Sequence, residues 1–236
     1  ATPVLHLLFR FQELWPGLAR EVLLRQWGDI RTRFLPAADA HQLGIHWGPL
    51  LARAELWPEA EEVFRQSLAR EEEAGVLNNY ANLLRLTGRA DLALAAVRRG
   101  LELAPASGPL LAHYAWLLLM RPEGIEAALP WVEKALAAAD HDGLAHYVHG
   151  LISRARGDQR EALADFHEAV MHQPLEGDYW AAYGDALVAT GDLDGALEVF
   201  TLAGRLCPRR AEFAWRQAQV LARQGNYSAA SERYAA

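Results

Sequence analysis

The chain has 236 residues, of which 52% are hydrophobic and 22% are charged. Its 30 acidic side chains exceed its 23 basic ones and give a net charge of −7, which disfavours a nucleic-acid-binding surface because such surfaces are basic. Alanine and leucine dominate and strand-forming runs of valine, isoleucine and threonine are absent, so the composition favours an all-helical protein.

Residues 1–40 are expected to form a degenerate hairpin. The run Glu13-Leu14-Trp15-Pro16 matches Glu55-Leu56-Trp57-Pro58, so a second helix is predicted to begin at Pro16, as another begins at Pro58. This second helix is expected to be about two turns longer than the others. Its apolar positions are Val22, Leu23, Trp27, Ile30 and Phe34.

Small and apolar residues mark three further hairpins, at about 41–73, 74–107 and 108–142. The first is marked by Trp47, Gly48, Leu51, Ala60 and Phe64. The second is marked by Leu77, Tyr80, Ala81, Leu84, Gly88, Ala93, Val97 and Pro105. The third is marked by Tyr114, Ala115, Leu118, Ala128, Val132 and Ala135. It has one extra residue, which we assign to the turn at 121–124 because loops tolerate insertion.

Residues 143–236 repeat with a fixed period of 34 residues. The equivalent positions are Gly157, Gly191 and Gly225; Ala162, Ala196 and Ala230; Phe166, Phe200 and Tyr234; and Pro174 and Pro208. Such a period is typical of stacked helical hairpins, none of which buries its apolar face alone. We therefore expect units at about 143–176, 177–210 and 211–236. The last is truncated, and we expect the chain to be part of a longer protein.

Close packing and turn signals agree with this assignment. Gly184 and Ala196 are expected where two helices approach most closely, because both residues are small. The large side chains that fill the space beside them are Trp180, Leu187 and Phe200. Pro208 is expected to end the second helix, because proline cannot continue the backbone hydrogen-bond ladder.

The turns between paired helices carry capping residues. Gly191 is expected to end one helix in a left-handed conformation, and Asp192 is expected to cap the next one. In the preceding unit, Asp158 and Glu161 are spaced as a reciprocal capping box. Both signals predict a tight helix-turn-helix connection.

The residues that carry the period resemble the tetratricopeptide repeat pattern, with Leu187 where the pattern usually has tyrosine. They are Trp180, Tyr183, Gly184, Leu187, Ala196, Phe200 and Pro208. The resemblance implies a single all-α, right-handed α-solenoid over residues 1–236, built from about six helix-turn-helix hairpins. It also implies that the first helices of successive hairpins line a groove that holds an extended or helical segment of a partner.

Residues of the first helices that packing does not require are expected to face this groove. These candidate partner-binding residues are Asn78, Asn79, Asn82, Arg85, Trp116, Tyr147, Leu151, Arg154, Asp185, Trp215, Gln219 and Arg223. The amides of Asn78, Asn79 and Asn82 either bond the backbone of an extended peptide or reflect the family consensus. Trp116 and Tyr147 either form an aromatic shelf for the partner or pack between repeats.

Five histidines fall within one hairpin, at His141, His146, His149, His167 and His172. His146 and His149 share a helix face and, with Asp140 or Asp142, would supply zinc ligands. The same two histidines occupy the places that the next repeat gives to Trp180 and Tyr183, so we expect them to face the hairpin interior. We therefore predict that these two histidines pack inside the hairpin and form no metal site. The sequence alone does not decide whether the group from His141 to His172 binds a metal.

The sequence has no glycine-rich phosphate loop, no nucleophile elbow and no HExxH helix, so we predict no catalytic residue and no cofactor. No run approaches the roughly 18 apolar residues of a membrane span, and we expect no direct membrane insertion. Residues 1–9 lack the charged segment of a signal peptide, and the single Cys207 cannot form an intramolecular disulfide. A cytoplasmic and a periplasmic location therefore both stay open.

One function of similar repeats is not expected of this chain. Repeats that grip the carboxylate tail of heat-shock chaperones carry a clamp of asparagine with lysine and arginine. Asn79 and Asn82 match the amides of this clamp, but Asn78, Pro109 and His113 stand where its basic residues are needed. A chaperone-tail adaptor is therefore disfavoured.

The sequence is best explained as a non-enzymatic scaffold that binds a protein or peptide in its groove. Only one of its 23 basic residues, Lys134, is a lysine, and such arginine bias indicates a GC-rich bacterial genome. One alternative is the substrate-recruiting or regulatory arm of an enzyme whose catalytic domain lies outside this segment. Another is the periplasmic arm of an envelope or exopolysaccharide export machine. Self-association through the solenoid ends also stays open.

Overall fold

The computed structural model describes residues 16–122, 124–139, 142–207 and 210–235. The regular elements of these residues are all helices, which confirms the expected all-α repeat fold. The chain divides into two compact units, residues 1–106 and 107–236. Some residues used in the sequence interpretation lie outside the described part, namely Glu13, Leu14, Trp15, Asp140, His141 and Pro208.

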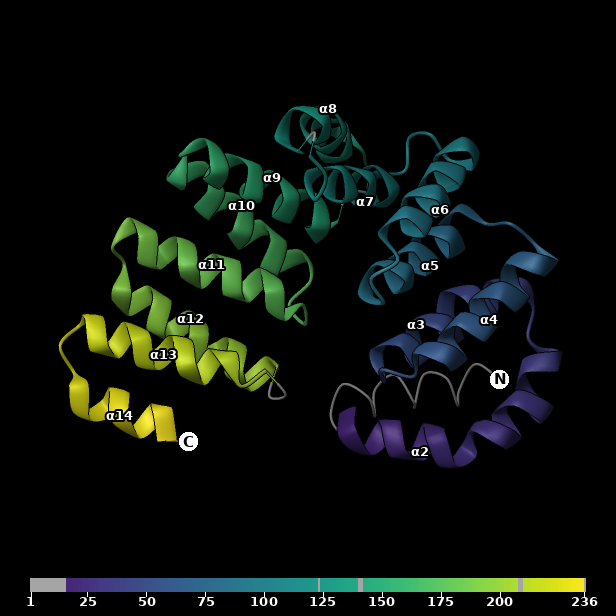
Figure 1. Ribbon diagram of the computed structural model, residues 1–236, viewed down its shortest axis with the longest axis horizontal. Helices are drawn as coiled ribbons and strands as arrows, with labels where there is room; N and C mark the ends of the chain where they lie inside the picture. Colours follow the sequence, from purple (N-terminus) through teal and green to yellow (C-terminus); the bar gives the residue numbers. More distant parts are fainter. Residues whose placement is uncertain (1–15, 123, 140–141, 208–209, 236) are drawn as a thin grey trace. The chain divides into compact units, whose positions relative to one another are not determined.

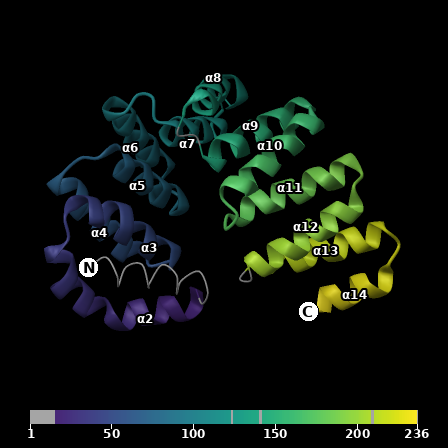
Figure 2. The ribbon, with the colours of Figure 1, turned by 180° about the vertical axis from the view of Figure 1, so that it is seen from behind.

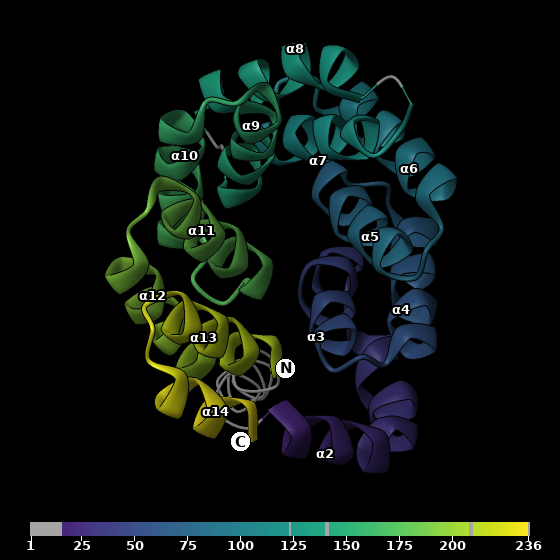
Figure 3. The same ribbon diagram turned by 60° about the vertical axis from the view of Figure 1, so that its left-hand side comes forward.

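The first unit contains the helices from α2 to α6 (Figure 3). They are α2 (Pro16–Asp29), the π-helix η1 (Ile30–Phe34), the 3-10 helix η2 (Leu35–Ala37), the π-helix η3 (Gln42–Trp47), α3 (Gly48–Arg53), α4 (Trp57–Arg70), α5 (Ala74–Leu86) and α6 (Ala90–Leu103). Because η1 and η2 follow α2 without a break, the helical course that begins at Pro16 continues to Ala37. It is longer than α4 or α6, as the sequence indicates.

Glycines let the helices of the first unit approach closely. A Cβ atom on Gly48 would lie 2.5 Å from the ring of Phe64, and one on Gly44 would collide with Val76. Both large side chains are fully buried. The segment from η3 to α3 therefore packs onto α4 and α5 through positions that accept no side chain.

An ion network joins α4 to the start of α6. Arg89 donates two hydrogen bonds of 2.9 Å to the carboxylate of Glu61, and the guanidinium of Arg65 lies 2.7 Å from the same carboxylate. The hydrogen bonds from Arg89 hold the pKa of Glu61 below its usual value although partial burial opposes the change. The network thus fixes consecutive hairpins of this unit to each other.

The second unit consists of consecutive helix pairs (Figures 1 and 2). They are α7 (Gly108–Leu119), α8 (Gly124–Ala137), α9 (Gly143–Arg156), α10 (Gln159–His172), α11 (Gly177–Thr190), α12 (Leu193–Leu206), α13 (Glu212–Arg223) and α14 (Tyr227–Ala235). The connection from α7 to α8 is longer than that from α9 to α10. Because α7 is shorter than α9 by the same amount, the placing of the extra residue at 121–124 stays a prediction.

The turns of the second unit use the capping residues that the sequence indicates. Gly191 has a φ of 89°, which is in the left-handed region, and Asp192 accepts a hydrogen bond of 2.9 Å from the backbone of Gly195. Asp158 likewise accepts one of 3.1 Å from the backbone of Glu161. Both caps were expected.

The predicted second hydrogen bond of this capping box, from the backbone N–H of Asp158 to the side chain of Glu161, is wrong. The backbone N–H of Asp158 already donates to the carbonyl of Ser153 at 2.9 Å. The side chain of Glu161 has instead turned to Ser153, whose hydroxyl donates to it at 3.0 Å. The glutamate therefore links the two helices of its hairpin and does not close the capping box.

The closest helix approaches in the second unit also involve glycine and phenylalanine. A Cβ atom on Gly150 would lie 2.7 Å from the ring of Phe166, and one on Gly184 would collide with the ring of Phe200. Ala196, on the opposite helix from Gly184, is fully buried. The predicted small positions thus lie at the interface between the paired helices.

Replacement of Ala196 by leucine should overpack this interface. The extra methylene groups have no space at a site with no exposed surface, so the change should lower the free energy of unfolding by about 1 to 3 kcal/mol. Urea denaturation followed by circular dichroism measures the loss. Ala189→Leu, at an exposed position of α11, is the matched control and should change stability little. Equal stability of the Ala196 variant and the control would contradict the burial of Ala196 between the paired helices.

Candidate partner-binding surfaces

In the first unit, the candidate residues lie on α5. The side-chain amide of Asn79 donates to the backbone carbonyl of Gly44 at 3.4 Å, so it joins α5 to η3. Asn82 is exposed and accepts two hydrogen bonds from Arg85, of 3.2 and 2.7 Å. Asn78 is half-buried. The polar group that this helix presents to solvent is therefore the Asn82–Arg85 pair.

In the second unit, the two aromatic candidates Trp116 and Tyr147 are half-buried. Trp116 packs against the cluster that contains Ala115 and Val132. The ring of Tyr147 stacks on Tyr179 of α11, with centroids 4.7 Å apart and planes at 28°. Packing therefore accounts for the covered face of each ring, and their use as a shelf for a partner remains a prediction.

Two further candidates on α9 surround the buried ring of Phe166. Leu151 packs against the cluster that contains this ring and Ala162. Arg154 is exposed, and its guanidinium lies 5.5 Å from the centroid of Phe166, a cation–π distance. The Phe166 ring thus attracts the guanidinium of Arg154, while the arginine side chain as a whole stays exposed.

The row on α13 is the most exposed group of candidates. Trp215, Gln219 and Arg223 follow one another at intervals of four residues, so they share a helix face. The tryptophan has 51% of its surface exposed, and the other two residues are exposed as well. Nearby, the carboxylate of Asp185 on α11 pairs with Arg216 of α13. The sequence interpretation had not singled out Arg216.

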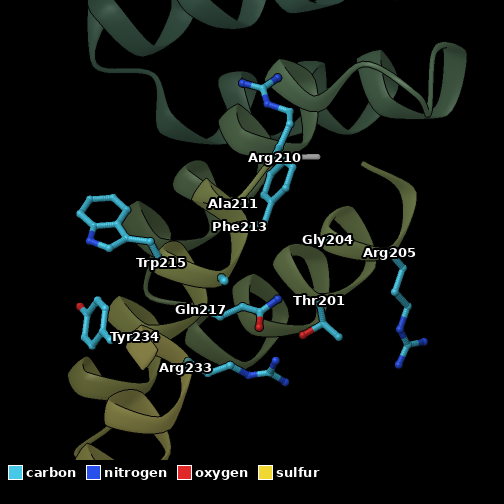
Figure 4. Close-up of a pocket in the computed structure, with 11 residues that line it drawn as sticks. Thr201, Gly204, Arg205, Arg210, Ala211, Phe213, Trp215, Gln217, Arg233 and Tyr234 are labelled. Atoms are coloured by element: carbon cyan, nitrogen blue, oxygen red, sulfur yellow. The ribbon is translucent and has the colours of Figure 1, made fainter. Parts of the chain in front are cut away.

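The sequence interpretation also missed a pocket of about 610 Å³ formed by residues of α12, α13 and α14 (Figure 4). Its lining includes Arg205, Arg210 and Arg233 together with the exposed aromatic residues Trp215 and Tyr234. A sequence signal for it exists. Residues 205–233 hold six arginines and two glutamates, which makes this segment basic within an acidic chain.

His146 and His149 both face Asp165 on the paired helix α10, as expected for residues inside the hairpin. The Nδ1 atom of His149 donates to Asp165 at 2.7 Å, and Nδ1 of His146 lies 3.6 Å from the other carboxylate oxygen. The described residues contain no group of three or more side chains placed to hold a metal ion. Within the described part of the chain, the two histidines therefore link α9 to α10 through Asp165.

The pair of His149 and Asp165 has shifted pKa values. The hydrogen bond to Asp165 raises the pKa of His149 above its usual 6.5. Burial alone would raise the pKa of Asp165, but the neighbouring imidazoles hold it below its usual 3.8. Both shifts favour the charged pair in the folded state.

These shifts predict how stability depends on pH. The contribution of His149 is fully present below pH 6.5 and is lost as pH rises through its raised folded pKa; that of Asp165 is present above pH 3.8 and is lost as pH falls through its lowered folded pKa. His149→Gln should therefore cost more stability at about pH 5.5 than at about pH 8.5 in urea titrations. His167→Gln, at an exposed position on α10, is the control. An equal loss at both pH values would contradict the ion pair.

The sequence profile of the tetratricopeptide repeat matches residues 46–108 and 147–208, together more than half of the chain. The chain belongs to the tetratricopeptide repeat family. The first match begins in η3 and runs through α6, and the second extends from α9 to the end of α12. No curated protein sequence matches the chain. Among the described helices, none combines the length and apolar character needed to cross a membrane.

Solved structures share this fold at low sequence identity. The chain is similar to the APC/C hetero-tetramer Cut9–Hcn1, with a TM-score of 0.73 and 18% identity over 96% of this chain and 44% of that chain. It is also similar to YrrB, a tetratricopeptide repeat protein with an unusual peptide-binding site, with a TM-score of 0.51 and 24% identity over 72% of this chain and 88% of that chain. A third example is TTC0263, a thermophilic tetratricopeptide repeat protein of Thermus thermophilus, with a TM-score of 0.63 and 18% identity over 77% of this chain and 98% of that chain. These likenesses show the repeat fold, and the chain spans less than half of the Cut9–Hcn1 chain.

Proposed function

We propose that the second unit is a non-enzymatic scaffold that binds an extended or helical segment of a partner protein along α13 and the neighbouring first helices. The observation that carries the proposal is Trp215, a tryptophan with 51% of its surface exposed in the row with Gln219 and Arg223. Tryptophan and arginine are enriched among residues that dominate binding energy at interfaces. The row offers an aromatic anchor, an amide and a charge on one helix face.

The contacts of Arg216 with α11 and α12 hold α13 in place, which favours binding by this row. Arg216 pairs with Asp185 of α11 and lies 5.8 Å from the ring centroid of Phe200, so α13 is fixed to its neighbours beside Trp215. A preorganised anchor loses less conformational freedom when the partner binds. The surface beside Trp215 therefore suits recognition of a peptide segment.

Other candidates would extend the same surface. Arg154 on α9 presents a charge, and the half-buried Tyr147 keeps part of its surface exposed. On α5, the exposed Asn82 with Arg85 would form the separate contact point of the first unit. Each of these groups can bond or cover a peptide without catalysis.

The proposal is compatible with the wider settings that the sequence left open. A peptide-binding scaffold would serve equally as the recruiting arm of an enzyme or as an arm of an export machine. The predominance of arginine over lysine supports a bacterial source. The proposed binding surface on α13 would be the same in each setting, so a single binding test serves all of them.

Peptides selected on the immobilised protein from a phage library of random peptides test this function. Trp215→Ala should weaken the selected peptides by about thirtyfold or more in fluorescence polarisation, because hot-spot aromatic residues contribute about 2 kcal/mol or more. Gln219→Ala with Arg223→Ala should weaken them as well. The melting temperature should change little, because these side chains are exposed.

Tyr227→Ala is the matched control for Trp215→Ala. Tyr227 is 73% exposed at the start of α14, so its loss removes a surface aromatic residue outside the α13 row. Its variant should bind the selected peptides as the unchanged protein does. Unaltered binding by the Trp215 variant, or an equal loss in the Tyr227 variant, would refute the proposed surface.

A further inference from the structure

The pocket beside α13 has features of a built site beyond the exposed row. Figure 4 shows Trp215 and Tyr234 on one side, and Thr201, Gln217 and Arg233 reaching into the space between α12, α13 and α14. Its volume of about 610 Å³ falls within the usual range of about 300–1,000 Å³ for ligand pockets. It is therefore large enough to receive a few side chains of a peptide.

Gln217 supplies an unpartnered acceptor in this pocket. Its side chain is only 5% exposed, and its Nε2 atom donates to the backbone carbonyl of Phe200 at 2.9 Å. Because only the nitrogen of the amide can donate to a carbonyl, this bond fixes the orientation of the group. The Oε1 atom is buried and has no hydrogen-bond partner among the described residues. A buried acceptor of this kind favours a ligand that brings an N–H group.

The charges of the pocket favour an anion. Arg205 and Arg233 line it, and neither has an ion-pair partner within residues 16–122, 124–139, 142–207 and 210–235. Arg210 differs, because it pairs with Asp178 at 2.7 Å and with Glu212 at 2.8 Å. Two arginines thus keep their charge available in a protein whose net charge is −7.

We propose that this pocket binds an acidic peptide segment. Its carboxylates would pair with Arg205 and Arg233, and a backbone N–H would donate to Oε1 of Gln217. Trp215 and Tyr234, which are 51% and 53% exposed, would cover its apolar side chains. Carboxylates match the two arginines, an N–H donor matches Gln217, and apolar side chains match the two aromatic rings. An acidic peptide is the simplest ligand that carries all three features.

Two fluorescein-labelled peptides test the site in fluorescence polarisation, at about 0.15 M salt to screen long-range attraction. One is Leu-Glu-Glu-Phe-Glu-Glu, and in the other every glutamate is replaced by glutamine. The acidic peptide should bind at least about tenfold more tightly than the neutral one, since charge-assisted hydrogen bonds are the stronger kind. The double variant Arg205→Gln with Arg233→Gln should lose about the same factor with an unchanged melting temperature.

Arg53→Gln with Arg160→Gln is the matched control, because it removes the same charge from exposed positions on α3 and α10. This control should leave binding unchanged. The proposal is overturned by failure of the acidic peptide to bind, by equal binding of the two peptides, by unchanged binding of the Arg205 and Arg233 variant, or by an equal loss in the Arg53 and Arg160 control.

Discussion

A close approach between a small residue and a large ring holds each of several hairpins together. Gly48 lies against Phe64, Gly150 against Phe166 and Gly184 against Phe200, always with the same separation along the chain. Each ring occupies space that a Cβ atom would need, so the two helices can meet only at a glycine. From α9–α10 to α11–α12 the contact recurs after 34 residues, which is the repeat period of the sequence.

The same packing decides which side chains remain for binding. On α13, Ala218 is fully buried, while Trp215 and Gln219 on either side of it along the chain are more exposed. The ion pair between Arg216 and Asp185 then fixes this helix to α11. Burial of the small residues against neighbouring helices thus positions the exposed row, which is the logic by which a helical repeat becomes a binding surface.

The sequence predicted the features that depend on local spacing. The helix pairs, the left-handed Gly191 and the cap at Asp192 follow from a few residues that are close in the chain. Contacts between hairpins were not predictable in this way, because they depend on side-chain conformations some thirty residues apart. The amide of Asn79 thus bonds to Gly44 inside the first unit, and the pocket of the second unit forms from three helices.

A double-mutant cycle on Gly184 and Phe200 tests the central constraint most directly. Gly184→Ala should destabilise the protein because its new Cβ atom collides with the ring of Phe200, which is 1% exposed and cannot move into solvent. Phe200→Leu should also destabilise it, but it removes the colliding ring. The double variant should therefore lose less stability than the two single losses combined, by about 1 kcal/mol or more in urea denaturation. Simple additivity of the two losses would contradict the account.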